Sequence, residues 1–260
     1  MLKLCMPTIT ETVRRLQSRI RGLEGWGPAA EFDVVSCGCA ALDRWLPGGG
    51  LRRGSLVEWL LAAPGGGAAT LALGCARQAC QDGGELIVLD RRRQVYPPAL
   101  AAWGVELERV ILVHPRDGAE EIWAWEQALR CASVAAVCGW VEQLDGNVFR
   151  RWQLAAESSG TLGLLIRPAT AVRQPSWADV RWWVEPRAAA RGRRVHVELL
   201  RCRGGTAGGS ADVEWDEWTS QLREVSLRHE THPRDLVAQL ARATAPGRQI
   251  GTAGARRRAL

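Results

Sequence analysis

The fold of this chain is determined by the stretch from Ser36 to Glu58, which reads SCGCAALDRWLPGGGLRRGSLVE. Its last residues begin an apolar run, Ser55–Leu61, that is typical of a buried β-strand. A glycine-rich turn follows at Pro64–Gly67, and Ala69–Asp82 has the pattern of a helix that ends at two glycines. The sequence therefore predicts a strand, a glycine-rich loop and a helix in direct succession.

Downstream of this unit, short apolar runs alternate with helical segments. The expected strands are Leu86–Leu89, Val110–Val113, Val134–Trp140 and Leu162–Ile166, and the expected helices are Pro97–Trp103, Asp117–Cys131 and Gly146–Ser159. Parallel strands need crossover connections, which are usually helices, and their buried positions read as apolar runs. The alternation therefore predicts an α/β fold with a mostly parallel twisted sheet flanked by helices.

The last third of the chain has a different pattern. Val180–Val184 and Val195–Arg201 follow each other without an intervening helix, so we expect antiparallel strands that extend one edge of the sheet. Gly204–Ser210 is expected to be a flexible turn and Pro233–Ala243 a short helix. The tail beyond Pro246 is rich in Gly, Ala and Arg and is expected to be disordered.

An amphipathic segment precedes the main unit. Thr8 and Glu11 have the spacing of a capping box. Four apolar residues then recur on one helical stripe: Val13, Leu16, Ile20 and Leu23. We expect a separate N-terminal helix that packs either on its own core or on a partner protein. The predicted organisation is this helix and a linker at 1–30, a core at 31–230, and a short helix with a basic tail at 231–260.

The composition is that of an ordinary globular protein, with 260 residues, of which 47% are hydrophobic and 24% charged. No run of about 18 apolar residues is present, and the N-terminus lacks the pattern of a signal peptide. We therefore expect a cytoplasmic protein without membrane contact. The eight cysteines include no C-x-x-C pair, which favours buried thiols over a metal site. The net charge of +6 is compatible with nucleic-acid contact but does not require it.

The residues around the glycine-rich loop resemble those of RecA and its relatives. In that family S-x-G-x-x-x-L-D precedes G-G-L-x-x-G and the strand that leads into the phosphate-binding loop. Here the two motifs are Ser36–Asp43 and Gly49–Gly54. Trp103-Gly104-Val105 stands where the family has a helix that ends in L-G-V. The resemblance covers residues 33 to 203 and implies a RecA-like core.

The loop itself departs from the pattern G-x-x-x-x-G-K-[ST]. It keeps three glycines: Gly65, Gly66 and Gly67. In one register Ala68 stands at the lysine position and Ala69 at the hydroxyl position. A shift by one residue brings Thr70 to the hydroxyl position and places Ala69 at that of lysine. Neither register supplies the cation that binds the β- and γ-phosphates, and the only lysine of the chain is the distant Lys3.

Three further positions have lost the functional groups of the family. Arg92 stands where these ATPases have the glutamate that activates water, and an arginine accepts no proton. The strand where an aspartate should hold magnesium ends at Gly139 and Trp140, so Gly139 marks the lost Walker B position. Arg167 follows the strand where a glutamine senses the γ-phosphate. The resemblance therefore implies a pseudo-ATPase without catalytic residues, cofactor or metal.

The run from Leu42 to Glu58, with Leu-Pro before three glycines, resembles the ImuA group of RecA-like proteins. Membership implies a non-catalytic accessory role in damage-induced translesion DNA synthesis. The implied partners are RecA, an ImuB-type Y-family polymerase homologue and, through the complex, an error-prone DNA polymerase α subunit. Two alternatives stay open. One is a SulA-like cell-division inhibitor, and the other is an atypical ATPase that would use Glu58, Asp90 or Glu142.

The resemblance also leads to two surface predictions. Because RecA protomers dock an N-terminal helix onto the next core, the stripe of Val13, Leu16, Ile20 and Leu23 is expected to bind RecA. The best candidate patch for DNA contact is the run of Arg91, Arg92 and Arg93. The loops that hold DNA in RecA are reduced to a short turn after Trp140 and to Pro168–Ser176, with Arg167 and Arg173 as cations. Any DNA contact is therefore expected to be weak or indirect.

Overall fold

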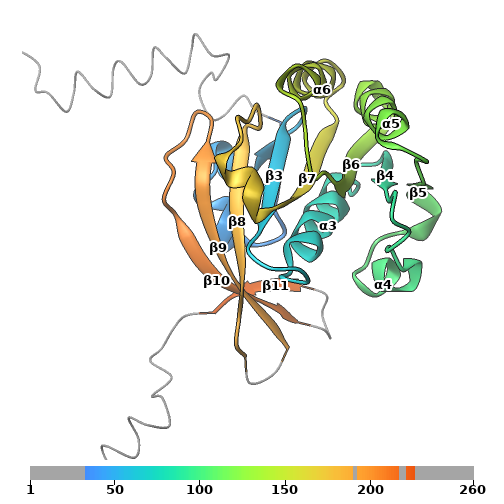
Figure 1. Ribbon diagram of the computed structural model, residues 1–260. Helices are drawn as coiled ribbons and strands as arrows, with labels where there is room; N and C mark the ends of the chain where they lie inside the picture. The colour runs from blue at the N-terminus through green and yellow to red at the C-terminus, as the bar shows by residue number, and fades with distance from the viewer. Residues whose placement is uncertain (1–32, 190–191, 217–220, 226–260) are drawn as a thin grey trace, which may run out of the picture. The chain divides into compact units, whose positions relative to one another are not determined.

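The computed structural model describes residues 33–189, 192–216 and 221–225 (Figure 1). Its first elements are β1 (Val34–Val35), α2 (Ala40–Asp43), η2 (Pro47–Gly49) and β2 (Leu51–Arg52), and β1 pairs antiparallel with β2. The Asp43 carboxylate accepts hydrogen bonds from Ser36 Oγ at 2.6 Å and from the Cys37 N–H at 2.7 Å. Leu42 is fully buried. The motif S-x-G-x-x-x-L-D is therefore a closed turn that anchors one leucine in the core.

The main sheet has nine strands: β3 (Leu56–Leu61), β4 (Glu85–Leu89), β5 (Val110–Val113), β6 (Val134–Trp140), β7 (Leu162–Pro168), β8 (Val180–Arg187), β9 (Arg193–Cys202), β10 (Ser210–Asp216) and β11 (Gln221–Glu224). Their spatial order is β11-β10-β9-β8-β3-β7-β6-β4-β5. All neighbours from β8 to β5 in this order are parallel. The pairs from β8 to β11 are antiparallel.

This topology confirms the predicted α/β class and corrects the predicted edge. We expected both β8 and β9 to be antiparallel additions, but β8 pairs in parallel with β3, so the antiparallel part begins at β9. The segment Gly204–Ser210, predicted to be only a flexible turn, leads into β10 and then β11. The buried residues of β10, Ala211, Val213 and Trp215, recur at every second position, a strand signal that the sequence analysis missed.

Helices lie on both faces of the sheet (Figure 1). The first, α3 (Ala68–Ala79), packs into one apolar core, whereas α5 (Gly118–Arg130) and α6 (Gly146–Ser159) pack into another. The shorter elements are α4 (Pro97–Ala102), η3 (Leu107–Arg109) and η4 (Ala169–Arg173). Asp117 and Asp145 begin α5 and α6 as N-caps, since each carboxylate accepts a hydrogen bond from a first-turn N–H.

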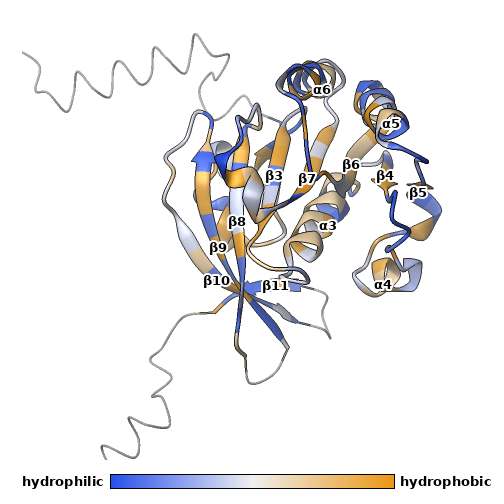
Figure 2. Cartoon of the chain, viewed as in Figure 1, coloured by the Kyte–Doolittle hydropathy of each residue, from blue (hydrophilic) through white to orange (hydrophobic). Residues whose placement is uncertain are grey.

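Each of the two cores contains a stacked pair of tryptophans. Trp59 and Trp182 lie 5.9 Å apart on the α3 face, and Trp125 and Trp152 lie 5.0 Å apart on the other face. All four rings are fully buried, as expected for tryptophans that fill a core. Figure 2 shows that the central strands around these rings consist mostly of hydrophobic residues.

The cysteines of the described residues are all free thiols. Most are buried as expected, but Cys131, just after α5, is exposed. No group of three or more potential metal ligands occurs among the described residues. Within the same ranges, no helix combines the length and the apolar character that crossing a bilayer requires.

The predicted N-terminal helix, the helix at 233–243 and the basic tail lie outside the described residues. The same is true of the partner-binding stripe Val13, Leu16, Ile20 and Leu23. These four assignments stay predictions.

Candidate functional site

A cavity of about 660 Å³ opens at the carboxyl ends of β3, β6 and β7, next to the start of α3. This is the edge of a parallel sheet at which α/β proteins bind ligands. Its walls include Leu61, Thr70, Trp103, Trp140, Ile166 and Arg193. We call it the loop cavity, because the glycine-rich loop forms one of its sides.

The glycines of the loop make room for the β8–β9 hairpin. Gly67 begins α3 with a φ of +87°, and an added Cβ there would lie 2.7 Å from Val195 Cγ1. An added Cβ at Gly66 would lie 2.8 Å from the Ala63 carbonyl oxygen and 3.3 Å from Pro186 Cδ. Gly67 requires glycine for both its backbone conformation and its packing, and Gly66 requires it for the close approach of neighbouring atoms. The glycine-rich character therefore has a structural reason that involves no phosphate.

The structure distinguishes between the two possible registers of the loop. Ala68 is fully buried in the core beneath α3, and it does not line the loop cavity. Ala69 and Thr70 both line the cavity. The shifted register, with Ala69 at the lysine position and Thr70 at the hydroxyl position, therefore fits the geometry. The cavity retains a hydroxyl there but has no lysine among the described residues.

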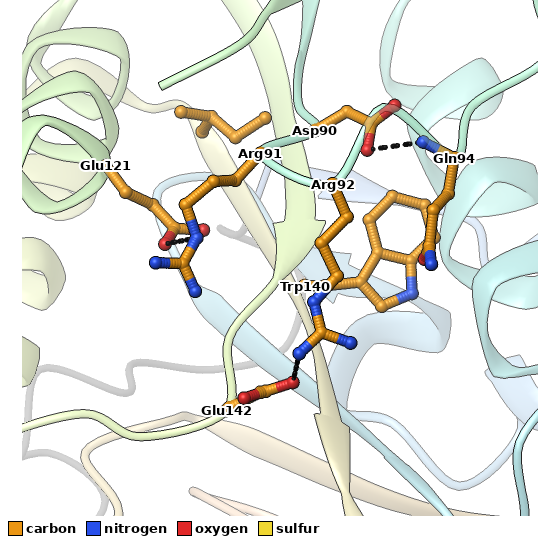
Figure 3. Close-up of a pocket in the computed structure, with 8 residues that line it drawn as sticks. Asp90, Arg91, Arg92, Gln94, Glu121, Trp140 and Glu142 are labelled. Carbon is orange, nitrogen blue, oxygen red and sulfur yellow. Dashed lines mark hydrogen bonds and ion pairs between the residues drawn. The ribbon is translucent and has the colours of Figure 1, made fainter. Parts of the chain in front are cut away.

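The turn after β4 contains the position of the lost base, Arg92. Figure 3 shows its guanidinium directed towards the Glu142 carboxylate, with which it forms an ion pair. Asp90 has a structural role: its carboxylate accepts hydrogen bonds from the N–H groups of Gln94, at 2.9 Å, and Val95, at 2.7 Å. Asp90 therefore stabilises the backbone of this turn, and Glu142 is paired with Arg92.

The residue of β6 that faces the cavity is Trp140. An added Cβ at Gly139 would lie 2.9 Å from the Leu89 carbonyl oxygen and 3.0 Å from Trp125 Cζ2, on the face of α5. Side chains alternate along a strand, so position 139 points away from the loop cavity and position 140 points into it. The resemblance pointed to Gly139 as the lost Walker B position, but Trp140, and not Gly139, is the residue of β6 whose side chain lies on the cavity side.

The position of the γ-phosphate sensor is also altered. Arg167 is fully buried and forms an ion pair with Glu58, also fully buried, on the face opposite the loop cavity. Arg181 Nε lies 2.5 Å from the same carboxylate, and Ser176 Oγ donates to it at 2.7 Å. Arg167 also donates to Gln174 Oε1 at 2.6 Å. We call these five residues the buried ion network; Arg167 is thus unavailable as a cation for DNA, contrary to our expectation.

The candidate DNA patch is partly neutralised. Arg91 Nε lies 3.2 Å from Glu121 Oε2, and Arg92 is paired with Glu142 (Figure 3). Burial raises the pKa of the Glu121 carboxyl, while the nearby guanidinium of Arg91 lowers it. Arg93 is exposed and has a left-handed backbone with a φ of +55°. The three arginines therefore present much less positive charge to a phosphate backbone than their number indicates.

Three residues of this region have roles that were not predicted from the sequence: Trp103, Arg193 and Glu58. Trp103 and Arg193 line the cavity although they come from α4's end and from β9, far from the loop in sequence. Glu58 was considered only as an alternative catalyst, but it is the centre of the buried ion network. An isolated glutamate inside an apolar strand was the available signal, because a buried carboxylate needs partners.

The chain is similar to several known proteins. No protein-family model matches the sequence. Protein ImuA of Caulobacter vibrioides is 32% identical over 254 residues, covering 86% of this chain and 99% of that protein. Protein RecA of Thermus thermophilus is 31% identical over 136 residues, which span 52% of this chain and 38% of RecA.

Among solved structures, the crystal structure of the RadB recombinase has a TM-score of 0.58 at 17% identity. The similarity covers 74% of this chain and all of that one. At this identity it shows the fold alone, which is that of a RecA-like recombinase.

Proposed function

Because the chain belongs to the ImuA family, we propose that it is a non-catalytic accessory protein of damage-induced translesion DNA synthesis. In this proposal it acts in the cytoplasm by binding RecA and an ImuB-type Y-family polymerase homologue. An error-prone DNA polymerase α subunit joins through that complex, and contact with DNA is weak or indirect. The similarity to ImuA over nearly the whole length of that protein is the observation that carries the proposal.

The chemistry of the loop cavity supports a role without ATP hydrolysis. Phosphoryl transfer needs charge neutralisation, a metal ion and a group that positions water. The corresponding positions are Ala69, Trp140 and Arg92, and the arginine is paired with Glu142. We therefore propose that the chain is a pseudo-ATPase whose RecA-like core serves as a scaffold for protein contacts.

A calorimetric titration tests the pseudo-ATPase proposal. We expect no saturable heat when ATP and Mg²⁺ are added to the full chain, because the described cavity residues include no lysine and their one carboxylate, Glu142, is paired with Arg92. RecA titrated under the same conditions is the positive control. Micromolar binding, or hydrolysis above the rate of a buffer blank, would overturn this part of the proposal and favour the atypical ATPase.

A co-purification experiment tests the partners. The tagged full chain should retain purified RecA and the ImuB-type homologue. The double substitution Val13→Asp with Leu16→Asp should reduce RecA capture by about tenfold or more, because charges on an apolar docking stripe are desolvated at a cost. Arg14→Asp with Arg15→Asp, off that stripe, is the matched control. Unchanged RecA capture by the stripe variant would exclude this helix as the RecA-binding element.

A further inference from the structure

We propose that the loop cavity is a docking pocket for a short segment of a partner protein in which a large apolar side chain lies next to a carboxylate. This inference rests on the proposed function, because it presumes a role through protein contacts. In this proposal, the cavity at the position of the RecA-like nucleotide site binds a side chain of a peptide segment instead of a nucleotide.

The size and walls of the cavity fit an apolar anchor. Its volume of about 660 Å³ lies within the range of ligand pockets. Leu61, Ile166 and the indoles of Trp103 and Trp140 supply apolar surface on several sides. Exposing such surface to water is unfavourable. The free energy of binding is most favourable when a leucine, phenylalanine or tryptophan side chain covers it. An apolar side chain therefore fits the interior better than a phosphate chain does.

The charges at the cavity call for a single negative group. Its charged wall residues are Arg92, Glu142 and Arg193. The first two neutralise each other, whereas no ion pair joins Arg193 to another described residue. The N-terminus of α3 opens on the same space at Ala69 and Thr70 and adds a partial positive charge. One carboxylate beside the apolar side chain would neutralise this positive charge. The negative charge of a triphosphate would be larger than the positive charge available.

The backbone around the cavity indicates the mode of binding. The N–H of Ala62 donates to the Val184 carbonyl at 2.9 Å, and the N–H of Val141 donates to that of Ile166 at 2.9 Å. These donors at the strand ends are therefore already used. A partner segment cannot add to β3 or β6 as a further strand here, so it must bind through its side chains. The apolar side chain and the carboxylate of the partner segment would together provide these side-chain contacts.

Two pairs of variants of the full chain test the inference. Ala69→Phe places a ring inside the cavity, and Ala119→Phe places the same ring at the equivalent second residue of α5, on an exposed surface. Arg193→Glu reverses the unpaired charge, and Arg187→Glu reverses an exposed charge on the same hairpin. Circular dichroism and the urea midpoint establish that each variant is folded.

Binding of the purified ImuB-type homologue, immobilised on a sensor, is the main measurement. We expect Ala69→Phe to raise Kd by about tenfold or more, because it fills the space of a hot-spot side chain. Arg193→Glu should raise Kd by about fivefold or more, with a loss that shrinks at high salt. The two controls should stay within about twofold. Arg193→Glu keeps the test decisive if Ala69→Phe does not fold, because Arg193 is exposed.

A second probe examines the cavity without a partner. The dye 8-anilinonaphthalene-1-sulfonate combines an aromatic body with one negative charge, so it should bind the wild-type chain and lose binding in Ala69→Phe and Arg193→Glu. Unchanged binding of the homologue by both folded cavity variants overturns the inference and leaves the proposed function intact. If the wild-type chain binds the dye but no partner, the proposed function and the docking role both fail, while the cavity remains an apolar anion site.

Discussion

The two faces of the sheet at the carboxyl end of β3 and β7 differ in how they use charge. On the α3 face, the loop cavity is open and mostly apolar, and its ion pair between Arg92 and Glu142 is exposed. On the other face, Glu58 and Arg167 are fully buried and hydrogen-bonded on several sides. The charged residues of the loop cavity are therefore exposed, whereas those of the buried ion network are enclosed in the core. This difference supports the proposed role of the core as a scaffold for protein contacts.

The largest effect is expected from the buried ion network. Glu58→Gln removes the carboxylate that faces Arg167 and Arg181, and two guanidinium groups then stay without their counter-charge. We expect a loss of about 3–5 kcal/mol in the free energy of unfolding, measured by urea denaturation.

The exposed pair provides the control for this comparison. Glu142→Gln removes the carboxylate that pairs with Arg92, in contact with water, and should cost at most about 1 kcal/mol. Equal losses for Glu58→Gln and Glu142→Gln would contradict the distinction between the two faces.

An intermediate effect is expected at the glycine-rich loop. Gly67→Ala should cost about 1–3 kcal/mol, since alanine disfavours a φ of +87° and its Cβ would overlap Val195. Gly65→Ala has a similar φ of +72° but nothing within 4 Å, so it should cost about 1 kcal/mol or less. Thermal unfolding of both variants measures the difference.

A second substitution separates backbone strain from steric overlap. Val195→Ala in the Gly67→Ala background should restore part of the lost stability, because it removes the atom that the new Cβ meets. If the two changes in the free energy of unfolding are additive, Val195 does not clash with the new Cβ. The requirement for glycine at position 67 would then need another explanation.

The smallest effect concerns the reactivity of two cysteine thiols, one buried and one exposed. Cys138 lies in β6 next to Trp140, and burial raises the pKa of its thiol to about 12. At pH 8 it is almost entirely protonated and unreactive. We therefore expect iodoacetamide to label exposed Cys131 in the native chain and to spare Cys138. Mass spectrometry of peptides after a timed reaction measures both sites. Rapid labelling of Cys138 would contradict its burial in the core of the native chain.

Much of the fold was predictable from the sequence, because its signals are local. The strand, loop and helix from Ser55 onward, the helices expected at Asp117–Cys131 and Gly146–Ser159 and the alternation up to Ile166 all appear in the structure as expected. The parallel pairing of β8 with β3 was not predictable, since strand order depends on contacts distant in sequence. The short alternating strand β10 was readable but missed.

The candidate site divides in the same way. The sequence alone determined which functional groups the chain lacks. The loop contains no lysine, and Arg92 cannot accept a proton. Only the tertiary structure decided which residues surround the cavity. It selected Ala69 over Ala68 and Trp140 over Gly139, and it brought Arg193 to the loop. The physical reason is that chemical identity belongs to each residue, whereas the face on which a side chain lies is set by strand register and by packing between distant segments.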